Sequence, residues 1–294
     1  MSAPAPPTRA AAPGRGRAFV GLQYLLPQHR LSRLVGAATR VRTRWFKNLL
    51  IRGFLRFYRV DLAEAAESDP LAYANFNAFF TRALAPGARP IAPAADAVAS
   101  PADGTFSECG AIDGDRLLQA KGRGYMLGEL LAGRDWARRF EHGSFATIYL
   151  APRDYHRVHM PCDGRLIETV FVPGRLFSVN TATARHVPRL FARNERVVTL
   201  FDGAGGGFAL IMVGALNVGS MATVWTGDIA PPDRRGPSRL AHAEIALHKG
   251  DELGRFNMGS TVILLFEPAR FRFAPAVVAG AGVRMGEAIG GLAA

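Results

Sequence analysis

Cysteine is scarce in this 294-residue chain, which contains only Cys109 and Cys162. Their spacing is not typical of a metal site, and two thiols do not make the framework of a disulfide-stapled domain. The chain length and the 49% hydrophobic composition allow one large core or two small ones without such cross-links. A reducing, cytoplasmic setting is consistent with this usage, and we expect no metal ion.

Long apolar runs are also missing. No apolar core followed by a small-residue cleavage site is present near the start, so no signal peptide is predicted. The best candidate for a membrane span, 208–225, is uncharged over 18 residues, which is the lower limit for a spanning helix. It contains Gly214, Asn217 and Gly219 among strand-forming residues, so two buried strands joined at a glycine bend explain it better. Any attachment to a membrane is therefore expected to be peripheral.

Acidic residues are absent from the first 60 positions, which hold eleven arginines and Lys47. The net charge of +12 comes from this stretch, because the remaining residues sum to zero. Apolar residues recur here at helical spacing, with basic residues between them. The apolar positions are Leu34, Ala38, Val41, Trp45, Leu49, Phe54, Leu55 and Tyr58, and the basic ones are Arg33, Arg40, Arg44, Lys47, Arg52, Arg56 and Arg59.

Charge alone leaves three interpretations of this stretch open. A basic amphipathic helix with aromatic residues can lie in the headgroup plane of an anionic bilayer, where each basic residue adds roughly 1 kcal/mol. The same helix could instead pack on the rest of the protein and show a solvated basic face, or contact nucleic-acid phosphates. No nucleic-acid motif accompanies the charge. We therefore expect an anionic membrane surface as a partner, and no nucleic acid.

The residue pattern predicts three regions along the chain. Residues 1–16 are rich in Ala, Pro and Arg and are expected to be a disordered leader. Residues 17–60 predict one or two amphipathic helices, broken near Pro27. Residues 61–294 predict a short helical region over 61–84, then strands after Pro90, with a helix at 125–131 and a loop at 231–238. The expected fold class is α+β, with an amphipathic helical N-terminus followed by a mainly antiparallel, β-rich domain.

A Gly259-Ser260 pair near the C-terminus runs straight into the apolar strand 262–266. A strained Gly-Ser bond can be cut by its own serine, which leaves a pyruvoyl group on the new chain end. Glycine favours this reaction because it tolerates unusual backbone angles and has no Cβ to block approach. The common alternative for such a sequence is an ordinary turn before a strand.

Two upstream segments supply the groups that could activate this serine. Residues 100–104 contain Asp103, and residues 153–161 contain His156 and His159. A carboxylate that orients a histidine, and a histidine that takes the serine proton, activate a weak alcohol nucleophile. Taken alone, Asp103 is typical of an Asp-Gly turn. The two histidines, taken alone, could be core residues, surface residues or half of a metal site. In an extended segment the two histidines face opposite sides, so we expect them to have different roles.

Together these segments resemble phosphatidylserine decarboxylases of the bacterial, membrane-associated type. The resemblance runs from about residue 21 to residue 268. It includes further stretches at 22–27, 76–82, 118–122, 172–180, 190–197, 213–215 and 254–256. One departure is Met258, where the family usually has leucine, and this change keeps volume and apolarity. The resemblance also favours the membrane interpretation of the basic N-terminal stretch.

The resemblance implies a pyruvoyl-dependent enzyme that decarboxylates phosphatidylserine to phosphatidylethanolamine and CO₂ in phospholipid biosynthesis. Asp103, His159 and Ser260 would form the self-processing triad, which cuts the bond between Gly259 and Ser260. Ser260 would become the covalent pyruvoyl cofactor, which forms a Schiff base with the substrate amine and acts as the electron sink. His156 would help the decarboxylation by protonating the carbanion.

The resemblance also implies an assembly and a location. The chains 1–259 and 260–294 would remain together as a heterodimer, which could dimerise further. The region 61–294 would be the catalytic domain, attached peripherally to the cytoplasmic face of the cell membrane. Lys121 and Arg123 are candidates to hold the substrate phosphate, although both are also typical surface cations.

Three other functions share part of the pattern. A pyruvoyl-dependent decarboxylase of a soluble amino acid would share the chemistry but leave the basic amphipathic stretch unexplained. A serine hydrolase could use Asp103, His159 and Ser260, but no Gly-x-Ser-x-Gly elbow surrounds the serine. A non-enzymatic, lipid-binding β domain on a membrane helix would remain an intact chain of 31.6 kDa.

Overall fold

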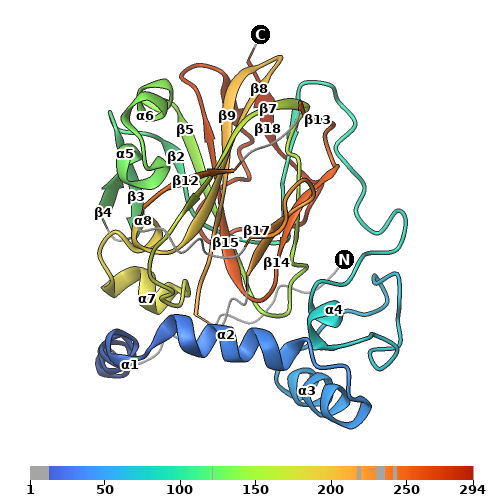
Figure 1. The fold of residues 1–294 in the computed structure, drawn as a ribbon. Coiled ribbons are helices and arrows are strands. Elements are labelled where there is room, and N and C mark those ends of the chain that lie inside the picture. Colours follow the sequence, from blue (N-terminus) through green and yellow to red (C-terminus); the bar gives the residue numbers. More distant parts are fainter. Residues whose placement is uncertain (1–12, 121, 217–219, 230–235, 241–243, 294) are drawn as a thin grey trace.

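The computed structural model describes residues 13–120, 122–216, 220–229, 236–240 and 244–293. Its first three helices lie along one side of the molecule (Figure 1). They are α1 (Pro13–Leu25), α2 (Gln28–Thr39) and α3 (Arg44–Phe57).

The expected break near Pro27 is confirmed, because α1 ends and α2 begins on either side of it. Proline lacks an N–H and disfavours helical angles in the residue before it. A second break at 40–43 makes three helices, where one or two were predicted. The expected leader also needs correction, because its last residues, 13–16, belong to α1. The rest of it, 1–12, lies outside the described residues.

Two buried glutamine side chains fasten α1 and α2 to the β-rich part of the molecule. Oε1 of Gln23 accepts a hydrogen bond from the backbone N–H of Ser178 at 2.8 Å. Oε1 of Gln28 accepts one from the N–H of Leu176 at 2.9 Å. These bonds satisfy backbone N–H groups of the domain. The helices α1 and α2 therefore pack against the domain, in addition to the amphipathic character predicted for this stretch.

The region 61–84 contains less helix than predicted. Only α4 (Phe76–Phe80) forms among its described residues, capped by the side chain of Asn75, and the rest is turns. Lys47 is buried and its Nζ donates to the Leu71 carbonyl at 2.6 Å, so Lys47 does not belong to the expected basic surface. Helices α3 and α4 share a small apolar core, which we call the aromatic cluster and which consists of Ile51, Phe76, Phe79 and Phe80.

Most of the remaining chain forms one large antiparallel sheet with strand order β12-β7-β8-β9-β15-β5-β2-β17, and β13 also pairs with β7. At its centre, β15 lies between β9 and β5. These central strands are almost continuously apolar and buried, as expected for strands covered on both faces. The bounds are β2 (Gly104–Ala111), β5 (Ser144–Leu150), β7 (Gly164–Val172), β8 (Arg196–Gly203), β9 (Gly206–Val213), β12 (Ser238–Leu240), β13 (Ala246–Leu247), β15 (Ser260–Phe266) and β17 (Gly282–Val283).

A second sheet has the order β11-β10-β14-β6, and its strand β14 leads directly into β15 through residues 257–259. The proposed cleavage bond therefore lies where the chain passes from one sheet to the other. Smaller sheets pair β1-β18-β16 and β3-β4. The bounds are β1 (Ala97–Ala99), β3 (Arg116–Ala120), β4 (Arg123–Met126), β6 (Arg157–His159), β10 (Met221–Thr223), β11 (Gly227–Ile229), β14 (Glu252–Phe256), β16 (Phe271–Phe273) and β18 (Ala288–Leu292).

Four further short helices complete the described structure: α5 (Leu127–Leu131), α6 (Arg134–Phe140), α7 (Thr181–His186) and α8 (Leu190–Arg193). The predicted helix at 125–131 corresponds to α5, and the stretch 208–225 contains strands β9 and β10, as predicted. Most of the predicted loop at 231–238 lies outside the described residues. Among the described helices, none has the length and apolar character needed to cross a bilayer. The expected α+β class is confirmed.

Candidate functional site

Backbone pairing brings the three predicted segments into one region. The N–H of His159 donates to the carbonyl of Pro101 at 2.8 Å, so the segment that carries Asp103 lies against β6. Strand β6 in turn pairs with β14. Because β14 continues into β15, the segment 257–260 follows directly from this paired region.

The backbone before the bond between Gly259 and Ser260 has unusual angles. Met258 has φ of 115°, a value that side-chain-bearing residues rarely adopt, and Gly259 has φ of +34°. A conformation of this kind costs roughly 1–3 kcal/mol and persists only where surrounding contacts hold it. A Cβ added at Gly259 would meet no atom within 4 Å, so the space beside this residue is open. The peptide bond between Gly259 and Ser260 therefore follows a strained residue, and the space beside Gly259 is open.

His156 lies opposite the end of β14, since its carbonyl accepts from the N–H of Phe256 at 3.0 Å. Its ring is fully buried and packs on Phe80, with 4.1 Å between ring centroids. Nδ1 is 2.8 Å from the carbonyl of Asp154. A carbonyl only accepts hydrogen bonds, so Nδ1 carries the proton and Nε2 has a free lone pair. Nε2 is buried and has no hydrogen-bond partner among the described residues.

Burial lowers the pKa of His156 to about 3, so the ring is neutral at physiological pH. The predicted role of His156 as a proton donor therefore needs one addition. Nε2 acts first as an acceptor, and it can donate a proton only after it has taken one.

His159 has the same tautomer but different partners. Its Nδ1 is 2.8 Å from the carbonyl of Gly250, and its Nε2 is 3.0 Å from the hydroxyl of Tyr155. Nδ1 therefore donates to the carbonyl, and Nε2 accepts from the hydroxyl. Burial lowers the pKa of His159 and raises the pKa of Tyr155 to about 12. Both groups are therefore neutral, and Nε2 is the basic atom. The two histidines thus have different hydrogen-bond partners at Nε2, and their expected difference in role stays a prediction.

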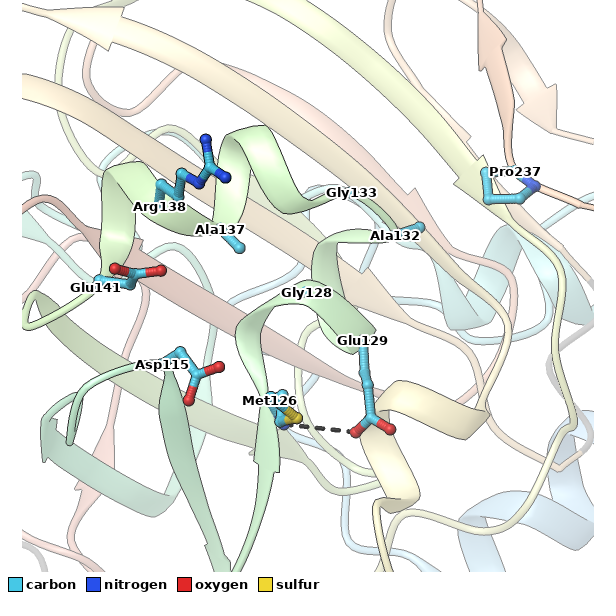
Figure 2. Close-up of a pocket in the computed structure, with 10 residues that line it drawn as sticks. All are labelled: Asp115, Met126, Gly128, Glu129, Ala132, Gly133, Ala137, Arg138, Glu141 and Pro237. Carbon is cyan, nitrogen blue, oxygen red and sulfur yellow. Dashed lines mark hydrogen bonds between the residues drawn. The ribbon is translucent and has the colours of Figure 1, made fainter.

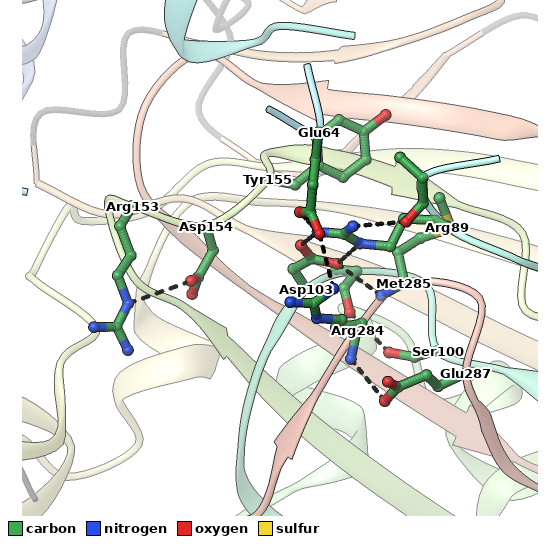
Figure 3. Close-up of polar contacts among 12 residues, drawn as sticks. Glu64, Arg89, Ser100, Asp103, Arg153, Asp154, Tyr155, Arg284, Met285 and Glu287 are labelled. Atoms are coloured by element: carbon green, nitrogen blue, oxygen red, sulfur yellow. Dashed lines mark hydrogen bonds and ion pairs between the residues drawn. The ribbon is translucent and has the colours of Figure 1, made fainter. Parts of the chain in front are cut away.

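Asp103 is bound by an arginine (Figure 3). Nε and Nη2 of Arg89 donate to its two carboxylate oxygens at 3.0 and 2.6 Å, and the N–H of Met285 donates to Oδ1 at 2.7 Å. Arg89 also pairs with Glu64 at 2.8 Å. Among the described residues, no hydrogen bond joins Asp103 to His159, so the expectation of direct contact needs correction. The carbonyl of Gly250 sets the tautomer of His159 instead.

Of the two candidates to hold the substrate phosphate, only Arg123 is among the described residues. Lys121 is outside the described residues, and Arg123 in β4 makes a long contact of 3.4 Å to the carbonyl of His186. A hollow of about 670 Å³ lies beside α5 and α6, where Figure 2 shows Glu129 and Arg138 on its wall. Figure 1 places α5 and α6 far from α4, so this hollow is separate from the histidines.

Sequence reasoning missed Arg89, Tyr155 and Gly250 as partners of the predicted residues. Tyr155 lies inside the motif at 153–161 and could have been singled out by its neighbours. Arg89 and Gly250 carry no signal of their own, because their contacts depend on how distant segments pair.

Comparison with known proteins shows the family of this chain. The profile of the family described as "Phosphatidylserine decarboxylase" matches residues 76–291, and a profile described as "PSD" matches residues 18–59. The chain is 55% identical over 275 residues to the phosphatidylserine decarboxylase proenzyme of Methylococcus capsulatus, covering 92% of this chain and 96% of that protein. It is 54% identical over 280 residues to the proenzyme of Pseudomonas paraeruginosa, covering 94% and 97%. The chain therefore belongs to the phosphatidylserine decarboxylase family.

Proposed function

We propose that this protein cuts itself between Gly259 and Ser260 and then decarboxylates phosphatidylserine to phosphatidylethanolamine at a membrane surface. The observation that carries the proposal is the strained backbone at Met258 and Gly259, in the connection that follows β14. The buried His156 lies opposite the end of β14 that leads into this connection, and the half-buried His159 pairs with the start of the same strand. The relatives are named as proenzymes that act on phosphatidylserine, which supports both parts of the proposal.

The first reaction is self-cleavage. The hydroxyl of Ser260 attacks the carbonyl carbon of Gly259, the C–N bond breaks, and an ester replaces the amide. Nε2 of His159 takes the serine proton, which requires the hydroxyl of Tyr155 to release this nitrogen. Loss of the Cα proton at position 260 then expels the Gly259 carboxylate. The dehydroalanine that remains takes up water and releases ammonia, which gives the pyruvoyl group.

Asp103 supports this reaction from a distance. Its carboxylate is fixed by Arg89 and by the N–H of Met285. It thereby anchors the segment whose Pro101 carbonyl binds the N–H of His159. We assign Asp103 the role of positioning the histidine through the backbone.

The pyruvoyl group would supply a ketone that accepts the electrons released when CO₂ leaves the substrate. The fully buried Nε2 of His156, opposite the end of β14, fits a site that needs a proton acceptor. This nitrogen takes the proton that the substrate ammonium group must lose. It returns a proton to the reacting carbon after CO₂ has left.

Peripheral binding to a membrane is supported by the surface of the N-terminal helices. Large apolar side chains are exposed there, and arginine residues lie between them in the sequence. The exposed fractions are 83% for Leu25, 70% for Leu34, 70% for Trp45, 62% for Leu49 and 80% for Phe57. An amphipathic surface of this kind inserts its apolar side chains at the level of the lipid headgroups.

Intact-mass measurement of the purified protein tests the proposal. We expect two chains, 1–259 and 260–294, the smaller with a blocked, ketone-bearing N-terminus. A Ser260→Ala variant should remain at 31.6 kDa and release no CO₂ from labelled phosphatidylserine. Release of CO₂ by an uncut chain would disprove the mechanism. Turnover of free serine at the same rate as the lipid would contradict the assigned substrate.

A further inference from the structure

Asn257, two residues before Gly259, is buried and held by four hydrogen bonds. Its N–H donates to the carbonyl of Ser220 at 2.9 Å. Its Nδ2 donates to Oγ of Ser220 at 2.6 Å and to Oδ1 of Asp228 at 2.9 Å, and its Oδ1 accepts from Nδ2 of Asn77 at 3.0 Å. Both amide donors and the amide oxygen are thus used, which fixes the orientation of this side chain.

The N-terminal helices take part in the same network. Nη2 of Arg40, at the end of α2, donates to Oγ of Ser220 at 3.1 Å and to Oδ2 of Asp228 at 2.8 Å. Arg40 therefore binds the two residues that hold Asn257, and Asn77 reaches the same amide from α4.

Met258, the next residue, is held by α3 and α4. Its side chain packs against the aromatic cluster, whose members come from these two helices. The backbone of Met258, with φ of 115°, is thus restrained by this side-chain contact and by the hydrogen bonds of the preceding Asn257. Both residues that precede Gly259 are therefore fastened to the helical N-terminal region.

We propose that Asn257 and Arg40 are positioning residues for self-cleavage, which hold the segment before Gly259 in its strained conformation through Ser220 and Asp228. The inference rests on the cleavage proposed above. Attack on a carbonyl needs the reacting atoms about 3–3.5 Å apart and aligned, and a misplacement of about 1 Å can cost roughly a hundredfold in rate. A segment released from this network would lose that alignment.

The network can be tested without loss of the fold, because the Arg40–Asp228 ion pair is exposed. The side chains are 37% and 56% accessible, and exposed pairs of this kind contribute little to stability. The ion pair between Arg189 and Glu129, at 2.6 Å, is also exposed and lies outside the network, so Arg189→Ala is a matched control.

The experiment is pulse-labelled synthesis of the full chain, followed by the rate at which it is cut into 1–259 and 260–294. We expect Asn257→Ala to slow cleavage by roughly ten- to a hundredfold and Arg40→Ala by a smaller factor of roughly three to ten. Arg40→Lys should restore part of the rate, because it keeps a cation beside Asp228. The melting temperature, measured in a Ser260→Ala background, should not change with Arg40→Ala.

The outcomes separate this inference from the proposed function. Cleavage of Arg40→Ala and Asn77→Ala at the rate of the unmodified chain would overturn the positioning role, even if Asn257→Ala failed to fold. Equal slowing by Arg40→Ala and Arg189→Ala would overturn it as well. If the unmodified chain is never cut after Gly259, the proposed function fails and the positioning role fails with it.

Discussion

Backbone carbonyls hold the imidazole rings of His156 and His159 in the same tautomer, with the proton on Nδ1. The two rings differ at Nε2. In His159 this atom is occupied by the hydroxyl of Tyr155, whereas in His156 it has no partner among the described residues. In the proposed mechanism, Nε2 of His159 accepts the serine proton after the Tyr155 hydroxyl has moved away, and Nε2 of His156 accepts a proton from the substrate.

The buried ring of His156 makes the stability of the protein depend on pH. The folded ring stays neutral down to about pH 3, whereas the unfolded ring takes up a proton near pH 6.5. Between these values the unfolded state binds more protons, so the free energy of unfolding falls as the pH is lowered. The contribution of this group is up to about 1.4 kcal/mol per pH unit.

A His156→Gln substitution should remove that part of the pH dependence. Urea unfolding of the uncut Ser260→Ala chain between pH 6.5 and 5 measures the slope, which should become shallower in the double variant. His248→Gln, at an exposed histidine, provides the control. An unchanged slope in the His156 variant would mean that the buried ring is protonated in the folded protein.

The sequence predicts candidate site residues by type and not their contacts. Asp103, the two histidines and the Gly-Ser bond are candidates because they lie in the segments that carry the family resemblance. Their hydrogen-bond partners could not be predicted. Arg89 reaches Asp103 only because the loop before β1 folds back on the loop before β2, and that arrangement follows from tertiary pairing.

At the scale of elements, the strands were easier to predict than the helices. Continuous apolar runs such as 208–213 and 262–266 mark central strands that are covered on both faces. The helical periodicity of 34–49 indicates helix, and α2 and α3 form there. It does not reveal the break at 40–43, because no glycine or proline lies in that segment. Elements as short as α4 and α8 carry too few residues for periodicity to be visible.

The exposed apolar residues of α3 predict how the protein binds membranes. A Trp45→Ser/Leu49→Ser variant should bind vesicles containing phosphatidylserine at least about tenfold more weakly. Complete burial of one such side chain is worth about 1.5–3 kcal/mol, and a tenfold change in affinity needs only about 1.4 kcal/mol. Co-sedimentation with vesicles measures the change.

Two exposed valines outside the N-terminal helices provide the matched control. Val224 and Val278 are 51% and 56% exposed, and a Val224→Ser/Val278→Ser variant should bind vesicles as the unmodified protein does. Equal binding by all three proteins would favour the alternative in which the helices only pack on the domain.

At the scale of the whole molecule, the proposed cut divides the chain into two pieces whose strands remain paired in the same sheets. Strand β15 begins at Ser260 and lies between β9 and β5, both of which belong to the larger chain. Strand β18 pairs with β1, and β17 pairs with β2. The small chain therefore contributes the centre of one sheet and parts of its edge and of a neighbouring sheet.

Cleavage is accordingly expected to leave a non-covalent heterodimer that separates only on unfolding. Residues 262–266 are buried throughout, so dissociation would expose the central core of the large sheet to water. Size-exclusion chromatography in native buffer should give one species that contains both chains, and the same sample in denaturant should give two. Loss of the 260–294 chain in native buffer would contradict this expectation, because it would require the central strand to leave a sheet that stays folded around it.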